Sequence, residues 1–234
     1  SKVQGNSRIK RAYNPKSRRS YVSQAALQQR AATRSGVAAG RFSDPGLAYQ
    51  WHYTNSGNNA FDKTNSTGET LAGSIAGCDV GCYEAWQKCT GDPSVIVAVL
   101  DDGVMYTHPD LAGNIWVNDK EELYAGTDAD GNGYKDDRYG YNFVHNTAAI
   151  SWTDVSDIGH GTHVSGTIAA MNNGYGVCGI AGGDGTKDSG VKIMICQVFA
   201  GENSVSLNGE AQAIKYAADN GAVILHCSWG YNSS

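Results

Sequence analysis

Residues 191–228 have the sequence VKIMICQVFAGENSVSLNGEAQAIKYAADNGAVILHCS, and this stretch decides the fold class. Two continuous apolar runs, at 191–199 and 222–228, flank a segment of helical composition at 207–221. Apolar runs without alternation are typical of strands buried on both faces of a parallel sheet. Strand, helix and strand in this order predict a right-handed crossover unit, with Asn208 as the expected cap of its helix.

Three further segments extend this pattern toward the N-terminus. VIVAVL (95–100) is another apolar run, and GTHVSGTIAAMN (161–172) has the small residues of a closely packed helix. VGCYEAWQKC (80–89) is predicted to be a helix with Trp86 on its inner face. Together the segments predict an α/β fold with a mostly parallel, buried sheet flanked by helices.

The composition is that of a folded domain with a basic extension. Apolar residues make up 41% and charged residues 18% of the chain. No apolar run reaches the roughly 18 residues of a membrane-spanning helix, so no transmembrane segment is expected. Residues 1–43 contain 10 Lys and Arg and no Asp or Glu, whereas residues 44–234 carry 8 − 23 = −15. We therefore predict two parts, a basic arm or pro-segment remnant at 1–43 and the folded part at 44–234.

The basic arm could contact nucleic acid, or it could be a solvated linker or the tail of a processed pro-segment. It contains only two Tyr and one Phe with which to stack on bases, and aromatic stacking contributes much of the binding to single strands. We therefore expect no nucleic-acid partner. The dibasic pairs Lys10-Arg11 and Arg18-Arg19 favour zymogen processing instead.

The six cysteines do not define a redox compartment. Three lie in apolar runs and are expected to behave as small buried hydrophobes: Cys178, Cys196 and Cys227. The other three surround the helix predicted at 80–89, where a disulfide and free thiols both fit the pattern: Cys78, Cys82 and Cys89. A zinc site is not favoured, since no His lies near them at ligand spacing.

The residues whose side chains are best suited to chemistry lie directly after the first buried strand and at the start of a predicted helix. The run at 95–100 ends in Asp101 and Asp102, and parallel sheets bind ligands at the carboxyl ends of their strands. A carboxylate there is either a turn residue that accepts backbone N–H bonds or a group that orients a histidine. His160, flanked by two glycines, is the candidate histidine. Metal binding by His160 and His163 is not favoured, since a helical zinc pair is four residues apart with a Glu between them.

Four stretches that contain the candidate residues follow one another along the chain: VAVLDDGV (97–104), HPDL (108–111), HGTHVSGTIAAMNN (160–173) and HCSWG (226–230). In this order they resemble the motifs of the subtilases, the subtilisin-like serine peptidases. The resemblance covers roughly residues 75–234 and implies a subtilisin-like α/β fold, incomplete in this chain. It also implies that Asp101 is the triad aspartate and His160 the general base, which takes the proton of a serine hydroxyl.

The resemblance also implies that the substrates are proteins or peptides. The DDG sequence is similar to that of the kexin and furin branch, which implies that Asp102 selects a basic residue next to the cut, the alternative being a solvated turn residue. The edge that pairs with the substrate backbone and walls the main specificity pocket is implied to consist of Ser228, Trp229 and Gly230. Trp229 replaces a smaller residue of the family, which indicates an altered wall.

The sequence departs from the family pattern at the nucleophile. Neither the GTSMA-like motif of the serine nor the GN motif of the oxyanion-hole Asn follows these stretches. A partial triad does not carry out acyl transfer at a useful rate. We expect the C-terminal remainder of the domain to be a second chain that carries the serine and covers the sheet edge. The alternative is a truncated or pseudo-peptidase, a non-catalytic calcium-binding module that binds extended peptides.

One or two calcium sites are expected. TDADGNGYKDD (127–137) places oxygen ligands at alternate positions, like the first half of an EF-hand loop. The expected ligands are Asp128, Asp130, Asn132, the carbonyl of Tyr134, Asp136 and Asp137, and the alternative is an acidic turn without an ion.

The second calcium site is implied only by the resemblance. Its ligands would be Asp110, the side chain of Asn173 and the carbonyls of Met171, Tyr175 and Val177. Dependence on calcium would indicate a protein that is secreted or at the cell surface, where free calcium is high.

Overall fold

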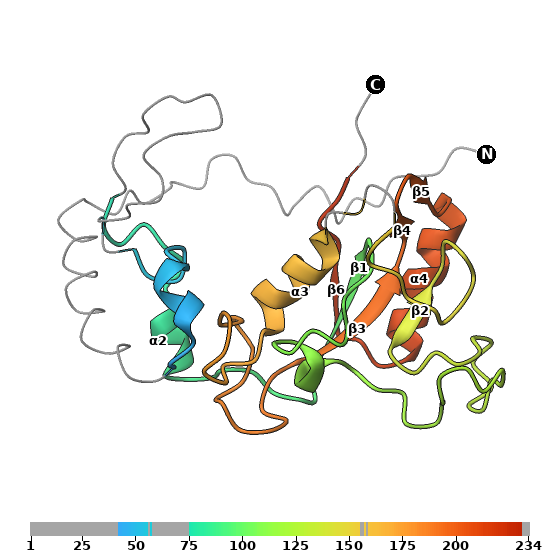
Figure 1. Cartoon of the computed structure of the whole chain (residues 1–234), viewed down its shortest axis with the longest axis horizontal. Coiled ribbons are helices and arrows are strands. Elements are labelled where there is room, and N and C mark those ends of the chain that lie inside the picture. The colour runs from blue at the N-terminus through green and yellow to red at the C-terminus, as the bar shows by residue number, and fades with distance from the viewer. Residues whose placement is uncertain (1–41, 56, 58–74, 155–156, 158, 231–234) are drawn as a thin grey trace, which may run out of the picture.

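A four-stranded parallel sheet forms the centre of the computed structural model, which describes residues 42–55, 57, 75–154, 157 and 159–230 (Figure 1). Across the sheet the strands are β2 (Gly140–Asn142), β3 (Lys192–Gln197), β1 (Ile96–Asp101) and β6 (Ile224–His226). Three of them lie in the predicted apolar runs. The predicted basic arm lies outside the described residues, except for positions 42 and 43.

The stretch that decides the fold forms strand, helix and strand, as predicted. Between β3 and β6 the chain runs through α4 (Leu207–Asp219). β6 pairs with β1, with Val97 opposite Ile224, and not with β3. The connection therefore passes over β1 and adds β6 on its far side.

The cap of α4 is Ser206, so the prediction of Asn208 was wrong. Ser206 has extended backbone angles, and its Oγ accepts the N–H of Gly209 at 3.3 Å. The helix begins at Leu207, which places Asn208 inside the first turn. A capping side chain must precede the first helical residue, because only there can its oxygen reach the free N–H groups.

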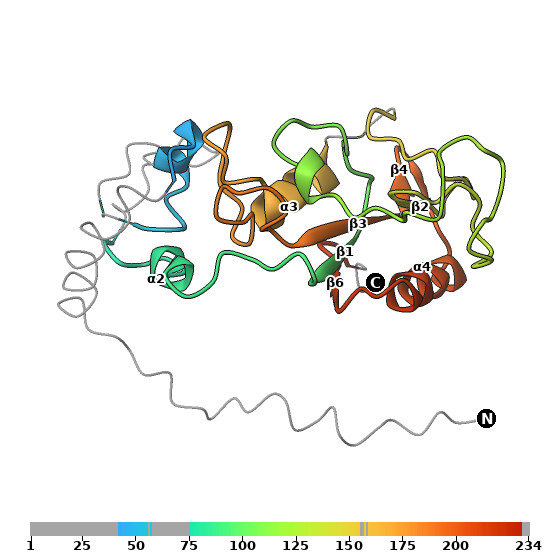
Figure 2. The ribbon, with the colours of Figure 1, turned by 90° about the horizontal axis from the view of Figure 1, so that it is seen from below.

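Two helices cover opposite faces of the sheet, as Figure 2 shows. Val97 and Val99 of β1 pack in one core cluster with the face of α3 (His160–Ala169) that includes Ala169. Ala98 and Leu100 pack in a second cluster with Ala213, Tyr216 and Ala217 of α4. Successive residues of a strand point to opposite faces, so continuous apolar character is what a strand between two helices requires.

Smaller elements complete the described part. A two-stranded antiparallel ribbon, β4 (Phe199–Ala200) and β5 (Asn203–Ser204), follows β3. Two short 3-10 helices span Pro45–Tyr49 and Ala112–Asn114. The helix predicted at 80–89 is shorter than expected, α2 (Cys82–Trp86). Trp86 lies on its inner face as predicted, and its Nε1–H donates to the carbonyl of Ile180 at 2.7 Å.

All six cysteines are free. Cys178 and Cys196 are buried as predicted, but Cys227 is exposed, which contradicts its predicted burial. Cys227 follows β6, which is the outer strand of the sheet, so no element of the described chain covers it. None of the helices in the described part of the chain has both the length and the apolar character needed to cross a membrane.

The outer edge of the sheet at β6 is apolar and exposed. Ile224 and Leu225 expose 49% and 41% of their surface, although they belong to a run as apolar as β1. Among the described residues β6 pairs with β1 alone. Folded proteins normally cover or charge such an edge.

Candidate active site

The end of β1 and the start of α3 bring Asp101 and His160 together. His160 Nδ1 lies 2.7 Å from Asp101 Oδ1, a hydrogen-bonded contact. The Asp101 side chain is 3% exposed, whereas 41% of the His160 side chain is exposed. A buried carboxylate thus holds one ring nitrogen of a histidine that remains accessible, as predicted from the motifs.

The electrostatics of the pair favour a protonated ring. The pKa of His160 is raised by its hydrogen bond to Asp101, and further by the charges of Asp101 and Asp102, although partial burial opposes the rise. Asp101 Oδ1 also accepts the N–H of Asp102 at 2.9 Å. This arrangement stabilises the imidazolium that forms when the ring takes up a proton.

Two glycines allow the strand end and the helix start to approach closely. A Cβ atom at Gly103, where φ is +93°, would lie 1.9 Å from the carbonyl oxygen of Ser151. A Cβ atom at Gly161 would lie 2.3 Å from the carbonyl oxygen of Gly103. The backbone contact that places His160 beside Asp101 therefore requires glycine at both positions.

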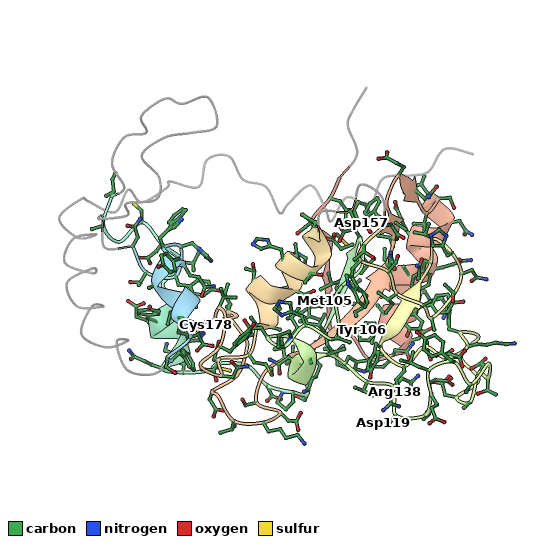
Figure 3. All side chains as sticks on the ribbon, viewed as in Figure 1. Met105, Tyr106, Asp119, Arg138, Asp157 and Cys178 are labelled. Carbon is green, nitrogen blue, oxygen red and sulfur yellow. The ribbon has the colours of Figure 1, made fainter. Side chains whose placement is uncertain are left out.

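The carboxylate of Asp102 points at the first turn of α3. Asp102 Oδ2 accepts the N–H of His160 at 3.1 Å, and Oδ1 accepts the N–H of Gly161 at 2.6 Å. Asp157, which also carries a carboxylate, lies above the strand ends in Figure 3, and it accepts the N–H groups of Asp154 and Gly201. Of the two acidic residues, Asp102 alone contacts the helix that carries His160.

The predicted substrate edge follows β6 in irregular backbone. Ser228 Oγ lies 2.6 Å from Nε2 of His226. Trp229 donates its indole N–H to the carbonyl of Leu100 at 2.7 Å, and its ring packs edge-on against Phe199. Gly230 is exposed, with open space where a side chain would be. The three residues lie at the carboxyl end of β6, the same end of the parallel sheet as Asp101.

The acidic loop before β2 gathers three carboxylates. Oxygen atoms of Glu121, Asp128 and Asp130 all lie within 4.8 Å of one another. Asp128 and Asp130 were predicted as ligands, whereas Glu121 was missed because it lies before the motif and has no local signal. Hard oxygen donors at this density suit Ca²⁺. The cluster therefore fits the ion that the sequence predicts.

The other predicted ligands of this loop adjoin the cluster but make hydrogen bonds of their own: the backbone N–H of Asn132 donates to Asp128 and Asp130, and that of Asp136 donates to Glu121. Asp136 Oδ1 accepts the backbone N–H of Gly126 at 2.7 Å. Asp137 is fully buried and accepts hydrogen bonds from Asn118, Asn132 and Tyr216. Asn132 uses its amide nitrogen for Asp137, and the ring of Tyr134 packs against Tyr216. The predicted ligands at 127–137 therefore include residues of the cluster and residues that anchor the loop to α4, and their spacing in the sequence does not distinguish the two kinds.

The second predicted calcium site contains a carboxylate that sequence reasoning missed. Asp110 is 2% exposed, and Asp44, far away in the sequence, is 4% exposed. Each has one buried oxygen without a hydrogen-bond partner among the described residues, Asp110 Oδ1 and Asp44 Oδ2. The pKa of Asp110 is raised, mainly by burial and also by the charge of Asp44, against the effect of the Val177 N–H. Two buried, facing carboxylates fit a cation.

The loop after α3, which contains the other implied ligands, contacts Asp110 through backbone N–H groups. Asp110 Oδ2 accepts the N–H of Val177 at 2.9 Å, and its carbonyl accepts the N–H of Met171. Asp44 Oδ1 accepts the N–H groups of Asn173 and Gly174. The Oδ1 atom of Asn173 accepts the N–H of Tyr175 at 2.9 Å. Met171, Asn173, Tyr175 and Val177 thus lie in the loop that closes over Asp110.

Comparisons with known proteins agree with this geometry. A family model described as the Subtilase family matches residues 92–234. The chain is 38% identical over 139 residues to Subtilisin-like protease 1 of Plasmodium vivax, which covers 58% of this chain and 20% of that protein. It is 31% identical over 152 residues to the halolysin-like extracellular serine protease Nep of Natrialba magadii, covering 64% of this chain and 23% of that protein.

A solved structure of a serine protease is also similar to this chain. The serine protease of Aeromonas sobria, solved in complex with the chaperone ORF2, matches with a TM-score of 0.57 and 26% identity. The match covers 82% of this chain and 26% of that one. The chain spans about a fifth of the length of the two curated relatives.

Proposed function

The chain belongs to the subtilase family, and we propose that it supplies two of the three catalytic groups of a serine endopeptidase, Asp101 and His160. The observation that carries this proposal is the 2.7 Å contact between Asp101 Oδ1 and His160 Nδ1, between a buried carboxylate and an accessible ring. The contact holds the proton on Nδ1 and leaves Nε2 as the base.

The residues would act in sequence during acyl transfer. A serine hydroxyl is a poor nucleophile near neutral pH and needs a base to take its proton. Nε2 of His160 would accept that proton and later deliver it to the leaving amine. Asp101 would keep the ring in the required tautomer and stabilise the imidazolium, in agreement with the raised pKa of His160. Extended peptide would lie along the edge that includes Ser228, Trp229 and Gly230.

The nucleophile would come from polypeptide outside these residues. We place it on the C-terminal remainder of the domain, as a second chain docked against β6. The exposed apolar side chains of Ile224 and Leu225 support this placement, because a further strand would cover them. The alternative, a calcium-binding module that binds peptides without cleaving them, is favoured only by the lack of a GTSMA-like motif among the 234 residues.

One experiment separates the two functions. Protein isolated from its source is analysed by native and denaturing mass spectrometry and then treated with a fluorophosphonate probe. A peptidase predicts a second chain that dissociates on denaturation and carries the probe, with labelling lost in a His160→Ala variant. Absence of any labelled serine in material that still binds extended peptides would identify the non-catalytic module.

Calcium is proposed at two places. Glu121, Asp128 and Asp130 would hold one ion, and Asp44 with Asp110 and its surrounding loop would hold the other. A calcium ion would supply charge neutralisation of the acidic groups and would stabilise only the folded form. Both sites lie outside the Asp101–His160 contact, so calcium would act on stability and not on proton transfer.

Secretion or cell-surface location is proposed together with zymogen processing. It is supported by the relative described as extracellular and by the acidic sites that would require high free calcium. Residues 1–43 would be the remnant of a pro-segment, cut at or near a dibasic pair. N-terminal sequencing of the mature protein tests this, because retention of residues upstream of Lys10 after maturation would contradict it.

A further inference from the structure

We propose that Asp102 is a positioning residue that fixes the first turn of α3, and with it the His160 ring, against the carboxyl end of β1. The inference rests on the proposed function, in which His160 is the base. It replaces the sequence-based hypothesis that Asp102 selects a basic substrate residue. The observation that carries it is that both carboxylate oxygens of Asp102 accept backbone N–H groups of α3.

The start of α3 has no cap of its own. The residue before the helix is Gly159, with φ of 71° and ψ of 29°, and a glycine has no side chain with which to cap the helix. The first N–H groups of a helix have no partner within it, and a side-chain oxygen normally satisfies one or two of them. Here that oxygen comes from Asp102, 58 residues before His160 in the sequence.

Adjacent aspartates therefore hold one histidine at two points. Asp101 Oδ1 contacts the ring Nδ1 at 2.7 Å, and Asp102 holds the backbone N–H of the same residue at 3.1 Å. The N–H of Asp102 donates to the same Asp101 oxygen at 2.9 Å, so the Asp101 carboxylate is also tied to the backbone of Asp102. A shift of the helix start relative to β1 would break the ring contact and the backbone contact at once.

Neighbouring contacts join the same two segments. Met105, which lies beside α3 in Figure 3, donates its N–H to Thr162 Oγ1 at 3.0 Å. A Cβ atom at Gly161 would lie 2.9 Å from Asp102 Oδ1, so the carboxylate packs tightly against the helix start. The loop after β1 thus contacts the helix start at three successive points, and Asp102 supplies the only charged group that binds its backbone among the described residues.

The geometry limits substrate selection by Asp102. A carboxylate offers about four lone-pair directions, of which two are already used by the helix. A substrate cation would therefore have to share the carboxylate with the helix, and loss of the carboxylate would release the His160 backbone whatever the substrate. Positioning therefore predicts an effect on turnover that is the same for every substrate.

Steady-state kinetics of the assembled protease test this with Asp102→Ala and Asp102→Asn. The substrates are two peptides that differ only in a Lys or an Ala next to the cut. We expect Ala to lower kcat about threefold to thirtyfold on both peptides with unchanged KM, the factor corresponding to a lost helix cap. Asn keeps one acceptor and is expected to recover part of the loss. Loss confined to the Lys peptide, equal for Ala and Asn and expressed in KM, overturns positioning in favour of selection.

A second measurement does not depend on peptidase activity. Amide hydrogen exchange and ¹⁵N imidazole shifts are recorded on the chain itself, for the parent, Asp102→Ala and the control Asp92→Ala, an exposed Asp that binds the N–H of Ser94. We expect Asp102→Ala alone to speed exchange at His160 and Gly161 and to mix the His160 tautomers, with His163 unchanged. Unaltered exchange and tautomer overturn the proposal even if the protein cleaves peptides, whereas altered exchange in a protein that never cleaves refutes only the peptidase.

Discussion

Replacing Asp44 by Asn is expected to change stability in opposite directions with and without calcium. Asn retains the Oδ1 acceptor that holds the N–H groups of Asn173 and Gly174, but it removes the charge at the unpartnered Oδ2. Without calcium the variant is expected to be at least as stable as the parent, because a buried charge no longer faces Asp110. With calcium it is expected to be less stable, because the ion loses a charged ligand.

The size of the effect follows from linkage between binding and folding. Free calcium at 100 times its Kd stabilises the folded form by about 2.7 kcal/mol. In a domain of this size, about 1 kcal/mol shifts Tm by about 2–4 °C, so calcium should raise the Tm of the parent by about 5–11 °C. If the variant binds a hundredfold more weakly, the same calcium contributes about 0.4 kcal/mol, a shift of about 1–2 °C.

Calorimetry in EDTA and at stepwise calcium concentrations provides the assay. The control Asp119→Asn removes an exposed acidic charge outside both clusters, and Asp128→Asn separates the other proposed site. Equal calcium-dependent shifts in the parent and in Asp44→Asn would refute the reasoning. So would a loss of stability in the variant that is the same in EDTA and in calcium, because that would assign Asp44 to hydrogen bonding alone.

Three further predictions concern the dyad, the buried network and the sheet edge. Asp101→Asn is expected to lower kcat of the assembled protease about 10⁴-fold. The hydrogen bond to Asp101 raises the pKa of His160, and the variant loses that bond. The rising limb of the pH profile of kcat/KM should therefore move to lower pH in the variant. Tyr216→Phe removes the 2.7 Å hydrogen bond to buried Asp137 and should cost about 1–3 kcal/mol in urea unfolding. Ile224→Lys should leave the chain folded by circular dichroism but abolish association with the serine-bearing chain in native mass spectrometry; continued association would exclude β6 as the interface. A matched control at an exposed position, expected to change nothing, is Leu207→Lys.

The parts of the fold that sequence predicts are those whose environment is uniform along the element. β1 and β3 are covered on both faces, so residues 96–100 and 193–196 are all apolar and the pattern is visible without knowledge of the neighbouring strands. β2 is three residues long and is held by backbone pairing of Gly140 with Ile195, which no side-chain pattern encodes. A Cβ at Gly140 would lie 1.9 Å from the Ile195 carbonyl, so the glycine reflects this pairing only once the partner is known.

The site divides in the same way. A strand end and a helix start made Asp101 and His160 candidates, but these local patterns left other interpretations open, and the resemblance to the subtilase motifs decided the assignment. Asp44 was not predictable because it acquires its surroundings from a segment distant in the sequence, and Glu121 was not predictable because it lies before the acidic motif and has no local signal. Asp137 satisfied the ligand spacing but is buried against Tyr216, since the loop needs an anchor as well as ligands.

The structure also indicates which elements orient the proposed base and its aspartate. The contact between Asp101 and His160 is built from β1 and α3, which share one core cluster and meet through Gly103 and Gly161. Asp101 Oδ2, buried and without a hydrogen-bond partner among the described residues, retains capacity to accept one more bond. In the proposed peptidase, β1 and α3 would thus hold the base and its orienting group, and the serine would add the reacting hydroxyl.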